Sequence, residues 1–327
     1  PFRFCRGLSK RISKVETMNK KIRAAVIGVG YLGKFHAEKY FKIDNSELVA
    51  VCDLNREQGE EIAKKFEAKY IANYEELVGL VDAVTIASTT SSHYKIAKFF
   101  LENNVHVHVE KPMTTTSQQG QELCEIAESN KLKLQVGHVE RFNPALVKAR
   151  EKLAKPLFIE CHRLAPFNSR GADVNVILDL MIHDLDVVLS LVKSPIKEVK
   201  ATGTHVLMST LDIANARVEF ESGAVANITA SRVSQTAQRK FRVFQEDQYL
   251  SIDFGSGQVQ LYTKEGELKD ESKLPIKKEE WNLEKSDALL AETEAFLDAI
   301  INDKPCLVSG EDGVRALQLA EQIIQQI

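Results

Sequence analysis

Short apolar runs alternate with helical patterns along the first part of the chain. Each run spans four or five residues and ends at polar or turn-forming residues, which is typical of buried strands. We expect strands at 24–27, 48–52, 83–87, 105–109 and 134–137, with helices from about 31 to 41 and at 57–67, 91–103 and 117–130. Short strands that alternate with helices of this length are typical of βαβ units and of a parallel sheet.

The pattern changes after Pro144. One helical pattern, at about 176–192, precedes several segments in which apolar and polar residues alternate, as in antiparallel strands with one covered face. Alternation of this kind covers 216–220, 224–230, 250–254 and 259–261. Two amphipathic helical patterns, 287–302 and about 311–326, follow. The sequence therefore predicts an α+β region with a large, mainly antiparallel open sheet.

Two domains and a short extension follow from these patterns. We expect residues 18–143 to form a Rossmann domain, an α/β fold with a doubly wound parallel sheet. Residues 144–327 are expected to form an α+β domain for substrate binding and oligomer contacts. Residues 1–17 carry five basic side chains against one acidic, and they precede Met18. We expect this stretch to be a disordered basic extension, either an upstream addition or a transit peptide.

Composition excludes several classes of protein. The chain has 327 residues, with 43 basic against 46 acidic side chains and a net charge of −3, so it lacks the basic surplus that a nucleic-acid backbone requires. No apolar run reaches the roughly 18 residues of a membrane helix. The five cysteines are scattered without a Cys-x-x-Cys pair, which favours reduced thiols over disulfides or a zinc site. We therefore expect a cytoplasmic protein without nucleic-acid or membrane partners.

A glycine-rich motif joins the first strand to the first helix. Gly28, Gly30 and Gly33 have the spacing Gly-x-Gly-x-x-Gly, with Tyr31 and Leu32 between the last two. In a dinucleotide-binding turn the first glycine makes the tight turn, the second lets the backbone approach a pyrophosphate, and the third lets helix and strand pack closely. An ordinary strand–turn–helix is the alternative, so the motif alone is weak evidence.

Asp53 completes this motif at the end of the second strand. It lies 20 residues past Gly33, where a carboxylate can accept a hydrogen bond from the adenosine ribose and repel a 2′-phosphate. The sequence therefore predicts NAD as the cofactor. Arg56 is the one feature that could instead favour NADP.

Further polar residues follow the ends of the parallel strands. Ser88, Glu110 and His138 each come directly after an apolar strand, and ligands of such sheets bind beyond the carboxyl ends of the strands. Lys111 and Pro112 follow Glu110, so we expect Lys111 to enter the same cleft, where its ammonium can donate to a hydroxyl. A surface ion pair of little energetic value is the alternative for Glu110 and Lys111.

The helical pattern at 176–192 is apolar on almost every side but carries three aligned ionisable residues. Asp179, His183 and Asp186 lie at i, i+4 and i+7, on one face. Ionisable groups on a buried helix need partners or a polar cavity. A functional site, an internal salt-bridge network and a two-residue metal site are the three interpretations, and no further ligand cluster supports a metal.

The order of these motifs resembles the Gfo/Idh/MocA (glucose–fructose oxidoreductase/inositol dehydrogenase) family. The resemblance extends from about Lys21 to the C-terminus. It implies NAD(P)-dependent oxidation of a sugar or cyclitol hydroxyl, with Lys111, Asp179 and His183 as catalytic residues and His93 on the cofactor side. The chain departs from the family at 88–90, where Ser-Thr-Thr replaces the usual Thr-Pro-Asn.

This resemblance suggests a division of labour among the catalytic residues. His183, with an ordinary pKa near 6.5, suits the role of general base at neutral pH. Lys111 is expected to hold the substrate oxygen and stabilise its negative charge. Asp179, one turn away, is expected to orient the imidazole or share its proton.

Narrower stretches are similar to one branch of that family, the UDP-N-acetylglucosamine 3-dehydrogenases. These stretches are 136–144, 163–167 and 179–186. The similarity implies oxidation at C3 of a UDP-sugar, in the route to a 3-amino sugar of lipid A, with arginines gripping the diphosphate. The substrate-binding residues that it implies are Arg141, Asn143, Arg163, Arg170 and His183. A surface charge is the alternative for each arginine taken singly.

Other functions stay open at this point. A dehydrogenase of inositol or another free sugar fits the same motifs, and a non-catalytic NAD-binding sensor would keep the fold. Lys111, Asp179 and His183 together favour an enzyme, since nucleotide binding alone requires neither Asp179 nor His183. We also expect a homo-oligomer, a dimer or tetramer, assembled through the C-terminal sheet.

Overall fold

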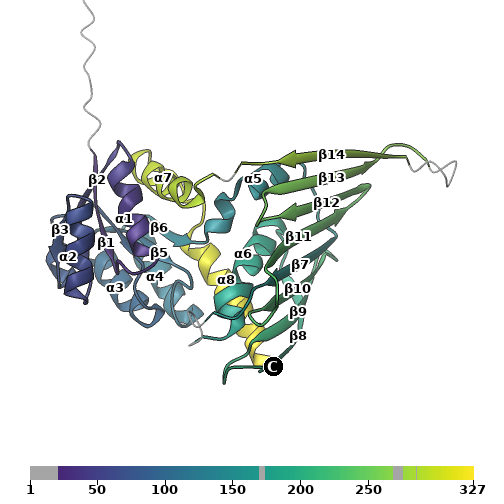
Figure 1. The fold of residues 1–327 in the computed structure, drawn as a ribbon, viewed down its shortest axis with the longest axis horizontal. Helices are drawn as coiled ribbons and strands as arrows, with labels where there is room; N and C mark the ends of the chain where they lie inside the picture. Colours follow the sequence, from purple (N-terminus) through teal and green to yellow (C-terminus); the bar gives the residue numbers. More distant parts are fainter. Residues whose placement is uncertain (1–20, 169–173, 268–274, 285) are drawn as a thin grey trace, which may run out of the picture.

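Two sheets built from different parts of the chain make up the molecule (Figure 1). This computed structural model describes residues 21–168, 174–267, 275–284 and 286–327. The predicted extension, residues 1–17, lies outside the described residues. The predicted α/β class, with a parallel sheet followed by a mainly antiparallel one, is confirmed.

The first sheet is parallel, and its strand order is β3-β2-β1-β4-β5-β6. Its strands are β1 (Ile22–Ile27), β2 (Ser46–Cys52), β3 (Lys69–Ile71), β4 (Ala83–Ile86), β5 (His106–Glu110) and β6 (Leu134–Gly137). The connecting helical elements are α1 (Gly33–Lys42), α2 (Arg56–Lys65), the 3₁₀ turn η1 (Tyr74–Leu77), α3 (Thr90–Glu102) and α4 (Ser117–Ser129). The winding direction reverses between β1 and β4, and ligands of such sheets bind at that point.

Helices cover both faces of this sheet, which explains its nearly continuous apolar strands. Along β1, Ala24 and Val26 pack beneath α1 and α2 on one face. Ala25 and Ile27 pack beneath α3 and α4 on the other. The glycine-rich turn therefore leaves the sheet from a strand that is fixed on both sides.

The second sheet has the order β14-β13-β12-β11-β7-β10-β9-β8. Its strands are β7 (Phe158–Leu164), β8 (Ile196–Thr204), β9 (Ile213–Phe220), β10 (Val225–Ser231), β11 (Gln238–Gln245), β12 (Gln248–Asp253), β13 (Gln258–Lys264) and β14 (Ile276–Asn282). Within the described ranges β7 and β10 form the parallel pair, and the other neighbours are antiparallel. The strands β3, β7, β8, β11 and β14 were not predicted from the sequence.

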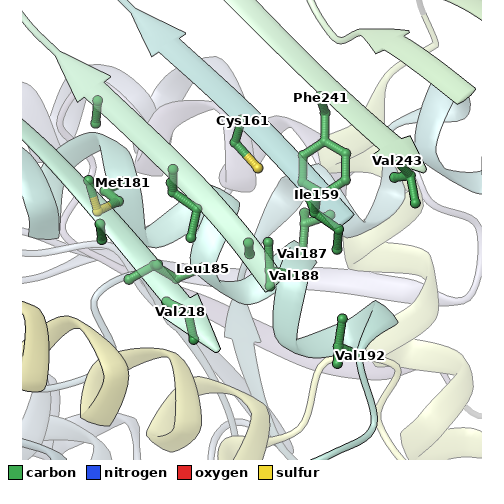
Figure 2. Close-up of a cluster of buried hydrophobic side chains, with 14 of the residues drawn as sticks. Ile159, Cys161, Met181, Leu185, Val187, Val188, Val192, Val218, Phe241 and Val243 are labelled. Atoms are coloured by element: carbon green, nitrogen blue, oxygen red, sulfur yellow. The ribbon is translucent and has the colours of Figure 1, made fainter. Parts of the chain in front are cut away.

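A large part of the core of the second domain lies between this sheet and α6 (Ile182–Leu191), which follows the π-helical turn η3 (Ile177–Met181). Figure 2 shows Leu185 and Val188 of α6 facing the strands, near Ile159 and Phe241. All four side chains are fully buried. α6 also contacts α8, so it has few exposed positions. This burial explains why its sequence is apolar on almost every side.

The last two helices return toward the first domain. The remaining helical elements are η2 (Val139–Phe142), α5 (Pro144–Arg150), α7 (Ala288–Ile301) and α8 (Gly310–Gln325). Leu297 of α7 packs in the core beneath α1, and α8 runs between the two sheets (Figure 1). Val314 near the start of α8 belongs to the first core, whereas Ile323 near its end belongs to the second. The boundary at residue 143 stays a prediction, because α7 packs in the cores of the first domain and α8 contributes to both domains.

Two further sequence expectations concern membranes and cysteines. In the described parts of the chain, no helix combines the length and the apolar character needed to cross a membrane. The four cysteines described there, Cys52, Cys124, Cys161 and Cys306, are free thiols. Burial raises the pKa of the Cys161 thiol, so this residue is a packing group rather than a nucleophile.

Candidate active site

The glycine-rich turn after β1 has the geometry that the motif predicts. Gly28 has a φ of +81°, and a Cβ added there would lie 2.7 Å from the backbone of Ser88. A Cβ on Gly33 would lie 1.7 Å from the carbonyl oxygen of Gly28. At Gly30 no described atom lies within 4 Å of an added Cβ, so the backbone there is open to a ligand. This open side, at the N-terminus of α1, suits a pyrophosphate.

Asp53 is fixed at the rim of this turn. Its carboxylate accepts hydrogen bonds from the backbone N–H groups of Val29 and Asn55, both at 2.8 Å. A carboxylate held there is suited to the adenosine ribose of NAD. Arg56, which could have favoured NADP, instead pairs with Glu60 one turn along the exposed face of α2, at 2.8 Å.

Three other residues expected near the cofactor lie around the same edge. Tyr31 and Leu32 are 56% and 42% exposed in the glycine-rich turn. His93 is buried, and its ring nitrogens lie 3.0 Å from the carbonyl oxygen of Pro112 and 3.1 Å from that of Ser88. His93 therefore joins the loop after β4 to the loop after β5, and its role on the cofactor side stays a prediction.

Lys111 reaches from the end of β5 to the second domain. Its Nζ donates a hydrogen bond to the carbonyl oxygen of Asp179 at 2.8 Å and lies 3.8 Å from a carboxylate oxygen of the same residue. Burial lowers the pKa of Lys111, and the charges of Asp179 and Glu110 oppose that shift. A surface ion pair does not describe this lysine, because only 16% of its side chain is exposed.

His183 lies four residues beyond Asp179, in the first turn of α6. The single helix predicted at 176–192 is divided there, because η3 is a π-helical turn of a kind that is frequent at functional sites. The pKa of His183 lies well below 6.5, because burial removes water and Lys111 and Arg163 add positive charge. The imidazole is therefore neutral at neutral pH and can accept a proton. Among the described residues its buried Nδ1 has no hydrogen-bond partner.

Asp186 and Arg141 depart from the sequence prediction. Arg141 donates to the carboxylate of Asp186 through Nε at 2.7 Å and Nη2 at 3.0 Å, and Nη2 also lies 3.2 Å from Asp312. Asp186 therefore belongs to an ion pair and not to the group formed by Lys111 and Asp179. Arg141 is buried between two carboxylates, and its binding of a substrate phosphate stays a prediction.

Arg163 is held by carboxylates in the same way. Its Nε and Nη2 donate to Asp184 at 2.9 and 3.0 Å, and its Nη1 donates to Glu140 at 3.0 Å. We call these three buried residues the Arg163 cluster. Although burial opposes it, the two carboxylates raise the pKa of Arg163 above its ordinary value. All three nitrogens of Arg163 are already paired in this arrangement, and its contact with a diphosphate stays a prediction.

The other two residues expected to bind substrate have different outcomes. Asn143 caps α5 by accepting from the backbone N–H of Ala145 at 3.0 Å, and it donates to Glu140 at 3.1 Å. It also lines a hollow of about 290 Å³ at the domain boundary, so it stays a candidate for substrate binding. Arg170 lies outside the described residues.

A buried polar cluster, which the sequence did not predict, lies beside Glu110. His36 Nε2 lies 2.8 Å from Glu110 Oε1, and His108 Nε2 lies 3.7 Å from Glu292 Oε2. We call these four buried residues the Glu292 cluster. Burial and the charge of Glu110 raise the pKa of Glu292 well above 4.5, whereas burial lowers the pKa of His108 to about 3. The signal available in the sequence was Glu292 itself, an acidic residue within the apolar stripe of a predicted helix.

Three members of the Glu292 cluster have the composition of a metal-binding set. His36, Glu110 and Glu292 each place one ligand atom within 4.8 Å of the others. These contacts are explained without a cation, because His36 can donate to Glu110 while Glu292 keeps its proton. The absence of a metal stays a prediction.

Comparison with protein families agrees with this geometry. A family model described as "Oxidoreductase family, NAD-binding Rossmann fold" matches residues 22–138, and a "GFO/IDH/MocA C-terminal domain" matches residues 151–251. The chain is 37% identical over 303 residues to a UDP-N-acetylglucosamine 3-dehydrogenase of Acidithiobacillus ferrooxidans, covering 92% of this chain and 96% of the relative. It is 28% identical over 236 residues to a scyllo-inositol 2-dehydrogenase (NAD(+)) of Bacillus subtilis, covering 66% and 69%.

Solved structures give the same result for the fold. A structure of the Acidithiobacillus ferrooxidans enzyme superposes with a TM-score of 0.88 at 36% identity, over 94% of this chain and 98% of that one. A scyllo-inositol dehydrogenase from Lactobacillus casei, with bound NAD(H) and scyllo-inositol, superposes with a TM-score of 0.79 at 20% identity, over 94% and 97%. The predicted NAD-dependent oxidoreductase class is thereby confirmed, and the chain belongs to the GFO/IDH/MocA family.

Proposed function

We propose that this protein oxidises the C3 hydroxyl of UDP-N-acetylglucosamine to a ketone with NAD. The observation that carries the proposal is the meeting of Lys111, Asp179 and His183 where the NAD-binding domain contacts the second domain. The similarity to the Acidithiobacillus ferrooxidans enzyme along nearly the whole of both chains supports this substrate. The 3-keto product then supplies an aminotransferase in the route to a 3-amino sugar of lipid A.

In this proposal the side chains of the chain handle the proton and the oxygen. NAD, when bound, supplies the hydride acceptor. His183 takes the proton of the C3 hydroxyl, because its imidazole is neutral at pH 7 and its lowered pKa reflects burial beside positive charge. Lys111 donates a hydrogen bond to the same oxygen and stabilises the negative charge that develops there. We assign to Asp179 the positioning of Lys111, because the two residues are in direct contact.

Oxidation of inositol or another free sugar is the second candidate, favoured by the similarity to the scyllo-inositol 2-dehydrogenase of Bacillus subtilis. Incubation with NAD and one sugar at a time, followed by NADH absorbance, separates the two. We expect turnover of UDP-N-acetylglucosamine and none of free N-acetylglucosamine. Comparable turnover of inositol would move the protein to the second candidate, and no turnover of any sugar would favour a sensor.

We also propose that the protein forms a homo-oligomer through the open face of the second sheet. Helices lie on one face of this sheet (Figure 1), and the other face carries a row of half-buried aromatic rings. Ring centroids are 5.7 Å apart for Phe158 and Phe244, 4.7 Å for Phe244 and Tyr249, and 5.4 Å for Tyr249 and Tyr262. Light scattering after gel filtration should give a mass of at least two chains, and Phe244→Asp should reduce it. A single-chain mass for the unaltered protein would contradict the proposal.

A further inference from the structure

We infer that Arg239 is the residue that binds the diphosphate of the sugar-nucleotide substrate. This inference rests on the proposed function and deepens it, because it names the residue that distinguishes a sugar nucleotide from a free sugar. Arg239 was not singled out in the sequence, and because Arg141 and Arg163 are both in buried ion pairs, neither arginine predicted for the diphosphate is unpaired among the described residues.

The position of Arg239 follows from strand alternation. Phe241 and Val243 of β11 point into the core beneath α6 (Figure 2), so Arg239, two residues before Phe241, lies on the same face of the sheet. It pairs in register with Arg163 on β7, whose partner Asp184 directly follows His183. The start of β11 therefore presents Arg239 toward the region of the catalytic residues and not toward the open face.

The charge of Arg239 is uncompensated, unlike that of its neighbours. Arg163 is paired with two carboxylates, and Lys111 contacts Asp179. Arg239 is exposed, and the described residues provide no hydrogen bond or ion pair for its guanidinium. An unpaired guanidinium fork suits two oxygens of a diphosphate, because its planar donors match phosphate geometry.

The surroundings of Arg239 connect it to both the catalytic group and an open space. Its positive charge adds to the lowering of the pKa of His183 by burial and by Lys111, and it opposes the rise that burial causes in the pKa of Asp184, so it lies within electrostatic range of the proposed base. It lines the same hollow of about 290 Å³ as Asn143, with Glu284 as the other charged residue of the lining and no ion pair between Arg239 and Glu284. A substrate held at His183 can thus extend its diphosphate toward this hollow.

A matched pair of variants tests the inference. Arg239→Gln removes the charge on the cleft side, and Lys240→Gln removes one charge from the next residue, which points to the opposite face of the same strand. Arg239→Gln should raise the KM for UDP-N-acetylglucosamine and the inhibition constant of UDP by about 10- to 100-fold, with kcat changed much less. The KM for NAD should stay unchanged in both variants, and Lys240→Gln should behave as the unaltered protein.

The outcomes separate this inference from the proposed function. Unchanged KM and UDP inhibition in Arg239→Gln, with an active unaltered enzyme, would overturn the role of Arg239 and leave the proposed function standing. Equal losses in both variants would likewise overturn it. If the unaltered protein oxidises no UDP-N-acetylglucosamine, the proposed function fails, and calorimetric titration with UDP alone then decides. Weaker UDP binding in Arg239→Gln supports the diphosphate contact, and absence of UDP binding to the unaltered protein overturns it.

Discussion

The two buried polar clusters on either side of Lys111 and His183 are neutralised in opposite ways. In the Arg163 cluster of the second domain, one guanidinium faces the carboxylates of Glu140 and Asp184, so ionised groups compensate each other. In the Glu292 cluster of the first domain, no arginine or lysine belongs to the group, and the balance depends on protons held by carboxyl groups and histidines.

This difference separates a permanent charge balance from one that depends on pH. An arginine keeps its charge at any working pH, so Arg163 is a fixed positive neighbour that adds to burial and to Lys111 in lowering the pKa of His183. The raised pKa of Glu292 and the lowered pKa of His108 make the first-domain cluster sensitive to pH instead. The positive charge that Arg163 contributes near His183 is therefore independent of pH. The protonation of the Glu292 cluster, which includes Glu110, depends on pH.

The largest expected effect comes from breaking the ion-paired cluster. Asp184→Ala leaves the buried Arg163 with Glu140 alone, and loss of one partner of a buried pair costs about 3–5 kcal/mol of the free energy of unfolding. Urea denaturation followed by circular dichroism measures this loss. Glu60→Ala, which breaks the exposed ion pair with Arg56 on α2, is the control and should change stability little. Equal losses in the free energy of unfolding of both variants would show that the buried ion pairs of the Arg163 cluster stabilise the protein no more than an exposed pair does.

A pH-dependent effect is expected from the proton-balanced cluster. The pKa of Glu292 is raised in the folded state, so the folded protein holds a proton that the unfolded chain releases above about pH 4.5. The free energy of unfolding therefore falls as pH rises, by about 1.4 kcal/mol per pH unit, until the pH reaches the folded-state pKa. Glu292→Gln has no such proton, so it should gain stability relative to the unaltered protein between pH 5 and pH 8.

Denaturation of both proteins at several pH values measures this difference. His108, whose lowered pKa acts in the opposite direction, is present in both proteins, so its contribution cancels. A stability difference that is the same at pH 5 and pH 8 would mean that Glu292 does not retain a proton in the folded state.

The smallest expected effect concerns Asp53, a half-buried carboxylate that belongs to neither cluster and is held by two backbone N–H groups. Asp53→Ser removes the negative charge that would repel a 2′-phosphate. The preference for NAD over NADP should therefore fall by about tenfold. Fluorescence titration with both cofactors measures the ratio, and tighter binding of NADP than NAD by the unaltered protein would sink the assignment.

Much of the fold could be predicted because its strands are apolar in a readable pattern. The missed strands lack that pattern. In β14 four of seven residues are charged, and the strand is held at the edge by its pairing with β13. In β7 the buried positions Ile159 and Cys161 are followed by Arg163, whose charge interrupts the apolar alternation. When a strand is held in place by its neighbouring strands rather than by burial of its own apolar face, its sequence gives little local indication of a strand.

The candidate site divides in the same way. Lys111 and the Asp179–His183 pair could be predicted, because strand ends and helical spacing are local features. The pairing of Arg163 with Glu140 and Asp184 could not, because it depends on which elements the fold brings together. Arg239 could not be predicted for the same reason. Its proposed role depends on its having no partner among the described residues and on the strand register with β7.

The most direct test of the account is the turnover of His183→Ala with UDP-N-acetylglucosamine and NAD, measured beside its NAD affinity. His183 lies on the second domain, away from the glycine-rich turn, so NAD affinity should stay nearly intact. Turnover should fall by roughly 10²–10⁴-fold, the usual contribution of a positioned base. Near-normal turnover by His183→Ala would contradict the central claim and leave His183 as a buried histidine of structural importance only.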